Sequence, residues 1–148
     1  VAAGGIGCAG AGLLADRVGR TTLTIGAMAV SGSTAVVIGF LFGAPPALTL
    51  IVGLVWGVSV VADSAQFSAA VTELGPPGTA GSALALQTAS GFLLTGITIT
   101  LVGLLSAPDA LGWRVVFALL AAGPLVGIAA MWRLRGRPEA VRMANGRR

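Results

Sequence analysis

Few residues in this chain have side chains that could do chemistry. The sequence holds five acidic residues, no histidine and one cysteine, Cys8. Histidine is the commonest general base and metal ligand, and one cysteine alone cannot form an intrachain disulfide. We therefore expect no catalytic residues, no bound metal and no cofactor, and we expect that the protein is not an enzyme.

One apparent nucleotide-binding motif lies near the start. Three glycines have the GxGxxG spacing: Gly5, Gly7 and Gly10. A dinucleotide-binding turn needs a preceding strand and an acidic residue about 20 positions later, but only VAAG precedes Gly5 and residues 21–62 are uncharged. We interpret the segment as a surface for close helix packing instead, because Gly4, Cys8 and Gly12 repeat at a spacing of four.

The composition is typical of a chain surrounded by lipid. It is 55% apolar and 9% charged, with a mean hydropathy of +0.94, whereas soluble domains carry about 25% charged residues. The nine basic residues are all arginines, and they stand at the edges of apolar runs without interleaved aromatic residues. We therefore expect a lipid bilayer as partner and no nucleic acid.

Four segments are long enough to cross a bilayer, which takes about 20 apolar residues. They cover residues 21–43, 46–72, 83–106 and 113–134. Residues 1–15 are apolar but too short to cross, and we interpret them as the end of a truncated helix. A secretory signal is the alternative, but it would start with basic residues. The predicted fold is an all-α, multi-pass transmembrane bundle, with a cytoplasmic loop at 16–20 and a basic cytoplasmic tail at 135–148.

The arginines predict the orientation of these spans. Arg17 and Arg20 follow the partial helix, and six more follow the last span: Arg133, Arg135, Arg137, Arg142, Arg147 and Arg148. An even number of crossings separates the two groups, so both lie on one side. The positive-inside rule assigns that side to the cytoplasm. We expect a cell-membrane protein, in the plasma or inner membrane, with a cytoplasmic carboxy terminus.

The segment GLLADRVGR, residues 12–20, resembles the signature loop of the major facilitator superfamily of secondary transporters, which runs G-x-L-a-D-r-x-G-r-k. The matching residues are Gly12, Leu14, Ala15, Asp16, Arg17, Gly19 and Arg20. Thr21 stands where a second basic residue is usual. The resemblance covers essentially all 148 residues of the chain.

The resemblance implies a twelve-helix fold in two halves, with a solute site between them. The first half of such transporters typically has an arginine motif in its fourth helix and a Gly-Pro motif in its fifth. Both are missing here, and Gly123-Pro124 lies in the last span instead. The chain therefore resembles part of the carboxy-terminal half: the end of one helix plus four complete helices. Its implied partners are the amino-terminal half and a small-molecule substrate.

By the same resemblance, the signature loop takes part in gating; the alternative is that it only fixes the topology. Asp16 is expected at the start of the following helix, where the helix dipole favours a carboxylate, and Gly19 is expected in the tight turn. Glu73 ends the second complete span on the same side as the signature arginines, where it opposes the dipole. We therefore expect Glu73 to contact Arg17 or Arg20.

Asp63 is the one charged residue well inside a span. An acidic group at that depth is costly and by default marks an ion path or a proton relay; the alternative is a paired or hydrated aspartate near a vestibule. Trp56 and Gln66 share its side of the helix and are secondary cavity candidates. Another side of the same helix carries small residues for close packing, among them Gly53 and Gly57.

The third complete span carries a second polar stripe, which includes Gln87, Thr88 and Thr95. These side chains line a solute path or form hydrogen bonds between helices, and both interpretations stay open. In the last span, Pro124 removes one backbone hydrogen bond and is expected to bend the helix.

Together these features predict transport of a small solute by alternating access, coupled to an ion or a proton. Asp63 is the first candidate for the coupling group, and the chain is expected to be a fragment of a permease of the major facilitator type. The alternative is a small four-helix exporter that works as a homo-oligomer.

Overall fold

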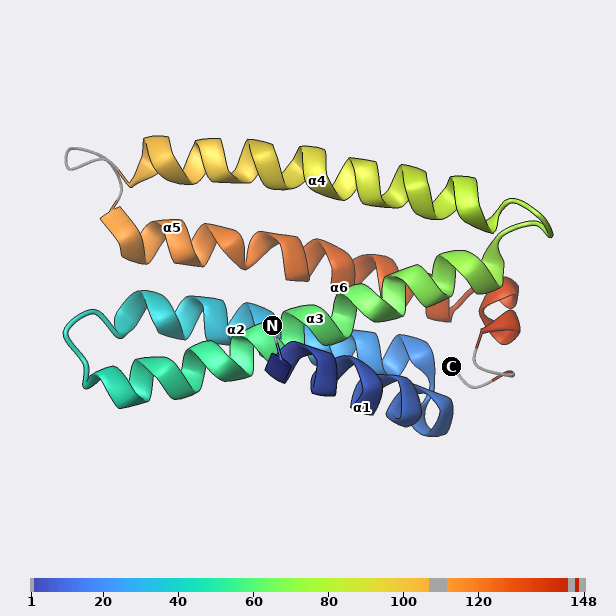
Figure 1. Cartoon of the computed structure of the whole chain (residues 1–148), viewed down its shortest axis with the longest axis horizontal. Helices are drawn as coiled ribbons and strands as arrows, with labels where there is room; N and C mark the ends of the chain where they lie inside the picture. Colours follow the sequence, from blue (N-terminus) through green and yellow to red (C-terminus); the bar gives the residue numbers. More distant parts are fainter. Residues whose placement is uncertain (1, 107–111, 144–145, 147–148) are drawn as a thin grey trace.

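The computed structural model describes the backbone of residues 2–106, 112–143 and 146, and their side chains except those of residues 2–4 and 6–9. The elements are α1 (Ala2–Val18), α2 (Arg20–Phe40), α3 (Pro46–Leu74), α4 (Ala80–Leu105), α5 (Gly112–Leu120), α6 (Ala122–Arg135) and the 3-10 helix η1 (Pro138–Arg142). The described residues form no strand, so the predicted all-α fold is confirmed. The helices run roughly along one axis, with their connections at the two ends (Figure 1).

Four helical stretches are long and apolar enough to cross a membrane. They are Arg20–Phe40, Pro46–Leu74, Ala80–Leu105 and Gly112–Arg135. Each agrees with a predicted span to within a few residues. The last stretch is interrupted at Ala121, between α5 and α6. Pro124 explains the interruption, because it has no N–H to donate to the carbonyl of Leu120.

The turn between α1 and α2 is shorter than the predicted loop at 16–20. Asp16 and Arg17 belong to the last turn of α1, and Arg20 is the first residue of α2. The expected position of Asp16 at the start of α2 is therefore wrong. The N-cap is Gly19, with φ 96° and ψ 140°, a conformation that is open to glycine and strained for other residues. One glycine is enough to reverse the chain here, so both flanking segments stay helical.

Helix α2 lies at the centre of the packing, in contact with α1, α3, α5 and α6. Its buried residues are Arg20, Thr21, Thr24, Met28, Ser31, Ala35 and Gly39. A Cβ on Gly39 would lie 3.1 Å from the Cβ of Phe117 and 3.2 Å from the backbone oxygen of Arg114. A larger residue at position 39 would thus crowd the place where α2 and α5 approach each other.

The small-residue surfaces predicted on other helices have no close neighbour among the described residues. A Cβ built on Gly12, Gly53 or Gly57 would meet nothing within 4 Å, so close packing of another helix at these glycines stays a prediction. Gly4 and Cys8 lie outside the described side chains. A glycine pattern shows where close approach is allowed, but not which partner arrives.

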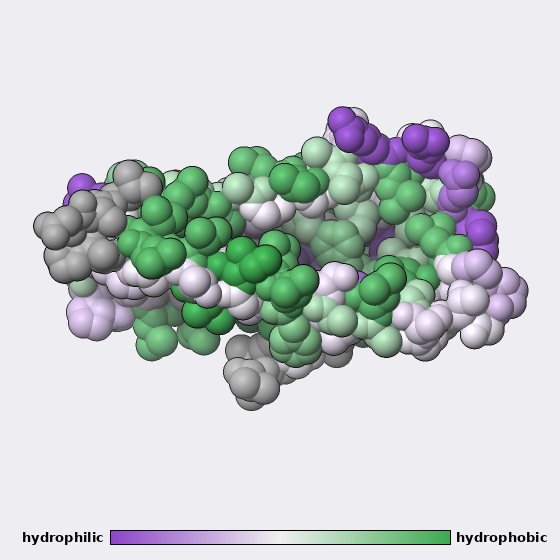
Figure 2. Space-filling model, turned by 90° about the horizontal axis from the view of Figure 1, so that it is seen from above, coloured by the Kyte–Doolittle hydropathy of each residue, from purple (hydrophilic) through white to green (hydrophobic). Residues whose placement is uncertain are grey.

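Helix α4 is the least embedded element, because none of its residues is buried. It lies along one side of the bundle (Figure 1). The face of the molecule seen from above in Figure 2 is largely hydrophobic, with hydrophilic residues gathered at the end that holds the carboxy-terminal segment. The four helices and this surface are compatible with an integral membrane protein.

The charged end of the bundle agrees with the predicted arginine grouping. Figure 1 places the α1–α2 turn and the end of α6 at the same end, and the start of α5, with Arg114, at the other. The exposed arginines at the first end are Arg17, Arg133, Arg135, Arg137 and Arg142; Arg147 and Arg148 lie outside the described residues. Trp113 and Trp132, near the two ends of the last span, are 46% and 67% exposed, as expected of interfacial aromatic residues.

Candidate functional site

Arg20 and Glu73 form a salt bridge between the start of α2 and the end of α3. Nη2 of Arg20 donates to Oε1 of Glu73 at 2.6 Å, and Nε donates to Oε2 at 2.9 Å. Two parallel bonds between a guanidinium and a carboxylate are the strongest geometry for such a pair. The side chains are only 10% and 30% exposed. The expected contact of Glu73 with a signature arginine is thus confirmed, with Arg20 as the partner.

Gln66 completes the surroundings of this arginine. Its Oε1 accepts a hydrogen bond of 2.6 Å from Nη1 of Arg20, and Gln66 is 2% exposed. Thr24 donates its hydroxyl to the backbone oxygen of Arg20 at 2.7 Å. Glu73 and Gln66, both on α3, thus accept hydrogen bonds from all three nitrogens of the guanidinium. We call Arg20, Gln66 and Glu73 the guanidinium cluster.

The helix dipoles oppose both charges of the guanidinium cluster. Arg20 is a cation in the first turn of α2, and Glu73 is an anion in the last turn of α3. Each charge at the wrong helix end costs about 0.3 to 1 kcal/mol. The salt bridge offsets part of these costs, so breaking it leaves both charges at helix ends whose dipoles disfavour them.

The signature residues next to Arg20 differ in their exposure to solvent. Asp16 and Arg17 are exposed at the end of α1, while Thr21 is 0% exposed. The hydroxyl of Thr21 has no hydrogen-bond partner among the described residues. A basic residue in place of Thr21 would have to be buried, which is costly without a partner.

Asp63 lies on the wall of a cavity of about 500 Å³ between α2, α3, α4, α5 and α6. Its neighbour Ser64 donates a hydroxyl hydrogen bond to Oδ1 at 3.2 Å. Trp56 and Phe67 line the same cavity, as does Ser31 from α2. We call this space the Asp63 cavity. Gln66 does not line it, because its side chain turns to Arg20.

An aromatic cluster leads from this cavity towards the end of the bundle that holds Arg114. Trp56 meets Phe117 edge-on, with ring centroids 6.0 Å apart. Phe117 in turn packs against Trp113 and Phe42, at 6.2 and 6.3 Å. The aromatic cluster of Trp56, Phe117, Trp113 and Phe42 joins α3, α5 and the turn between α2 and α3.

The polar stripe of α4 makes one contact with another helix. Gln87 donates from Nε2 to the hydroxyl of Ser68 on α3 at 3.3 Å, and its Oε1 is buried without a partner in the described part of the protein. Thr95 bonds the carbonyl of Gly91 in its own helix, and Thr88 is exposed. None of the three lines the Asp63 cavity.

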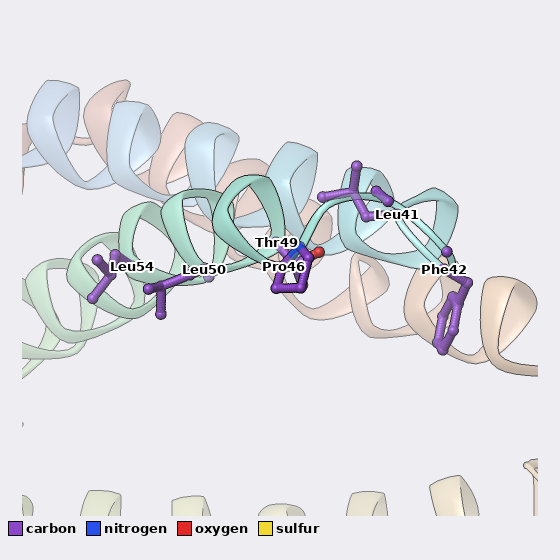
Figure 3. Close-up of a pocket in the computed structure, with 9 residues that line it drawn as sticks. Leu41, Phe42, Pro46, Thr49, Leu50 and Leu54 are labelled. Carbon is purple, nitrogen blue, oxygen red and sulfur yellow. The ribbon is translucent and has the colours of Figure 1, made fainter.

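A second hollow lies outside the turn between α2 and α3 (Figure 3). Its labelled residues come from this hairpin alone: Leu41, Phe42, Pro46, Thr49, Leu50 and Leu54. Leu50 and Leu54 point to the same side of α3, as their spacing of four requires. With Thr49 as its one side-chain polar group, the hollow has the character of a lipid-facing surface.

Several residues of both sites carry no signal in the sequence. Ser31 reaches the Asp63 cavity from α2 and Phe117 joins the aromatic cluster from α5, and neither stands in a motif. The described residues hold no group of three or more His, Cys, Asp or Glu that could bind a metal ion.

Comparison of the chain with models of protein families, with curated proteins and with solved structures finds no match. The resemblance of residues 12–20 to the major facilitator signature therefore rests on those residues themselves.

Proposed function

We propose that this chain is part of a secondary transporter of the major facilitator type, in which two halves rock around a central solute site. The observation that carries the proposal is the guanidinium cluster. In it, the arginine of the signature segment pairs with a carboxylate at the end of α3. A mostly buried arginine and carboxylate that join two helices through two hydrogen bonds suit a contact that forms in one access state and breaks in the other.

The other features of the proposed transporter are its location, its second half and its coupling group. The chain lies in the cell membrane with its carboxy terminus in the cytoplasm, and it forms part of the carboxy-terminal half of a twelve-helix transporter. The amino-terminal half is the partner expected to cover α4, which buries no residue in this chain. Asp63 binds and releases the coupling ion or proton as solvent access alternates, and the transported solute undergoes no covalent change.

A homo-oligomeric exporter of four helices is the second candidate, because an exposed α4 also offers a surface to further copies of the chain. The mass of the detergent-solubilised complex separates the two candidates. An assembly of several 148-residue chains supports the exporter, whereas one copy bound to a second half supports the transporter.

The experiment that tests transport uses the protein expressed from its complete gene and sealed into liposomes that contain a pH-sensitive dye. Under the proposal, one of a panel of small solutes causes proton movement, and Asp63→Asn abolishes it. Glu139→Gln is the matched control, because Glu139 is an exposed carboxylate of η1, and this change leaves the movement intact. Equal proton movement in wild type and Asp63→Asn would overturn the coupling role.

A further inference from the structure

We propose that the Asp63 cavity binds a lipophilic organic cation, such as an amine or quaternary ammonium compound that carries an aromatic ring. This inference deepens the proposed function by naming the class of solute, and it rests on that function in treating the cavity as part of a solute path. It is carried by the charge, the aromatic residues and the polarity of the cavity wall.

The charge of the wall is negative. Asp63 is the only charged residue among those that line the cavity, and no described arginine lies within salt-bridge distance of it. Its hydrogen-bonding neighbour, Ser64, is neutral. A carboxylate in these surroundings attracts a cation and repels an anion, and the partly apolar environment strengthens both effects.

Aromatic rings lie on both sides of this carboxylate along α3. Trp56 precedes Asp63 by two turns and Phe67 follows it by one turn, and all three line the cavity. Their spacing places them on one side of the helix, with their Cα atoms about 10 Å and 6 Å along the axis from that of Asp63. Tryptophan and phenylalanine faces bind organic cations, and the quaternary ammonium group is a frequent ligand of such sites.

The remaining wall excludes strongly hydrated solutes. Ser31 is its one neutral side chain with a hydroxyl, and leucine, valine, alanine, methionine, glycine and proline supply the rest. A sugar or an amino acid would lose its hydrogen bonds to water here, whereas an apolar cation needs one anionic partner.

The volume of the Asp63 cavity and the aromatic residues that lead to it also fit a lipophilic cation. About 500 Å³ is within the range of sites for drug-sized ligands. The aromatic cluster continues from Trp56 through Phe117 to Trp113 at the start of the last span. These rings offer a cation successive weak binding surfaces between that end of the bundle and Asp63.

The test measures binding of benzyltrimethylammonium to the full 148-residue chain in lipid nanodiscs. Trp113→Phe and Trp132→Phe leave Trp56 as the single fluorescent tryptophan, so its emission reports on the cavity wall. We expect a saturable change with benzyltrimethylammonium. We expect binding weaker by about tenfold or more for neopentylbenzene, the uncharged ligand of the same shape, because it lacks the Coulombic attraction to the carboxylate.

Variants then locate the site. Asp63→Asn should weaken binding of the cation by about tenfold or more without affecting neopentylbenzene. Asp63→Glu, which keeps the carboxylate, should still bind the cation more tightly than neopentylbenzene, and the exposed control Glu139→Gln should leave binding of the cation unchanged. Equal affinity of wild type for the charged and the uncharged ligand would overturn the proposal, and that result does not depend on how well any Asp63 variant folds.

Failure of the cation site can be distinguished from failure of the proposed transport function. Solute-dependent transport by the complete protein, together with no preference for the cation, would refute the cation site and keep the transporter. Binding of the cation at Asp63 without any transport would support the site and refute the transporter.

Discussion

Arg20 and Glu73 are 53 residues apart in the chain, yet they meet through two hydrogen bonds of 2.6 and 2.9 Å. Each stands at a helix end whose dipole disfavours its charge. Because both are mostly removed from water, loss of one charge leaves the other poorly compensated. This effect can be measured apart from transport, by reversible unfolding of the chain in mixed detergent micelles.

Reversal of the charge of Glu73 should destabilise the fold. Glu73→Arg places two cations together, and we expect a loss of about 3 kcal/mol in the free energy of unfolding. This is the lower end of the usual range for a broken buried pair, because Glu73 is 30% exposed. The double variant Arg20→Glu/Glu73→Arg should recover most of the loss, as measured by the helical circular dichroism signal. If the double variant is no more stable than the single one, the pair does not hold these helices together.

Loss of the Gln66 amide should weaken the same cluster. Gln66→Leu leaves Nη1 of Arg20 without its acceptor, and a hydrogen bond to a charged group contributes about 1.5 to 3 kcal/mol to the free energy of unfolding. Gln87→Leu is the matched control, because its bond to Ser68 is longer at 3.3 Å and joins neutral groups. We expect the control to change the free energy by about 0.6 kcal/mol or less. Equal losses in the two variants would argue against a special role for Gln66.

Thr21 and Thr24 allow one substitution to be compared at two buried positions. Thr21→Val removes a hydroxyl without a described partner, so the free energy of unfolding should stay unchanged or rise by up to about 1 kcal/mol. Thr24→Val removes the hydroxyl that bonds the Arg20 carbonyl. This change should lower the free energy of unfolding by about 0.5 to 1.5 kcal/mol. A larger loss at Thr21 than at Thr24 would show that the Thr21 hydroxyl has a partner in the membrane-embedded protein.

Gly39 and Gly53 provide a comparison for helix packing. Gly53→Ala meets nothing within 4 Å, so it should stabilise the chain by up to about 1 kcal/mol through helix propensity. Gly39→Ala meets backbone atoms of Arg114 at 3.2 and 3.3 Å, and overpacking costs about 1 to 3 kcal/mol. Because the gain from helix propensity applies to both variants, their free energies of unfolding should differ by the overpacking cost of about 1 to 3 kcal/mol. No difference would mean that α2 and α5 are farther apart than the structure places them.

The sequence predicted the helices well because lipid imposes a simple requirement of length and hydrophobicity. Gly and Pro residues fix where each helix ends, and the break near Pro124 follows from its missing N–H. The contact of Glu73 with a signature arginine was also predictable, because an anion at a helix carboxy terminus needs a cation.

The sequence did not predict which side chains of neighbouring helices contact one another. Nothing in the pattern of α3 shows that Gln66 turns to Arg20 while Asp63, one turn away, turns to the cavity. Asp16 was misplaced because a single residue, Gly19, makes the whole turn. Such details depend on helix rotation, which hydrophobicity leaves nearly undetermined in these spans.

The exposure of α4 has a consequence for mutational tolerance. No residue of α4 is buried, so the described chain places almost no shape requirement on its side chains beyond Gln87, which bonds Ser68, and Leu94, which lines the Asp63 cavity. If this chain worked alone, exchange of one apolar residue for another along α4 would be nearly silent in a saturation mutagenesis screen for growth. A band of intolerant positions on one side of α4 would therefore trace the outline of a neighbour that lies outside this chain.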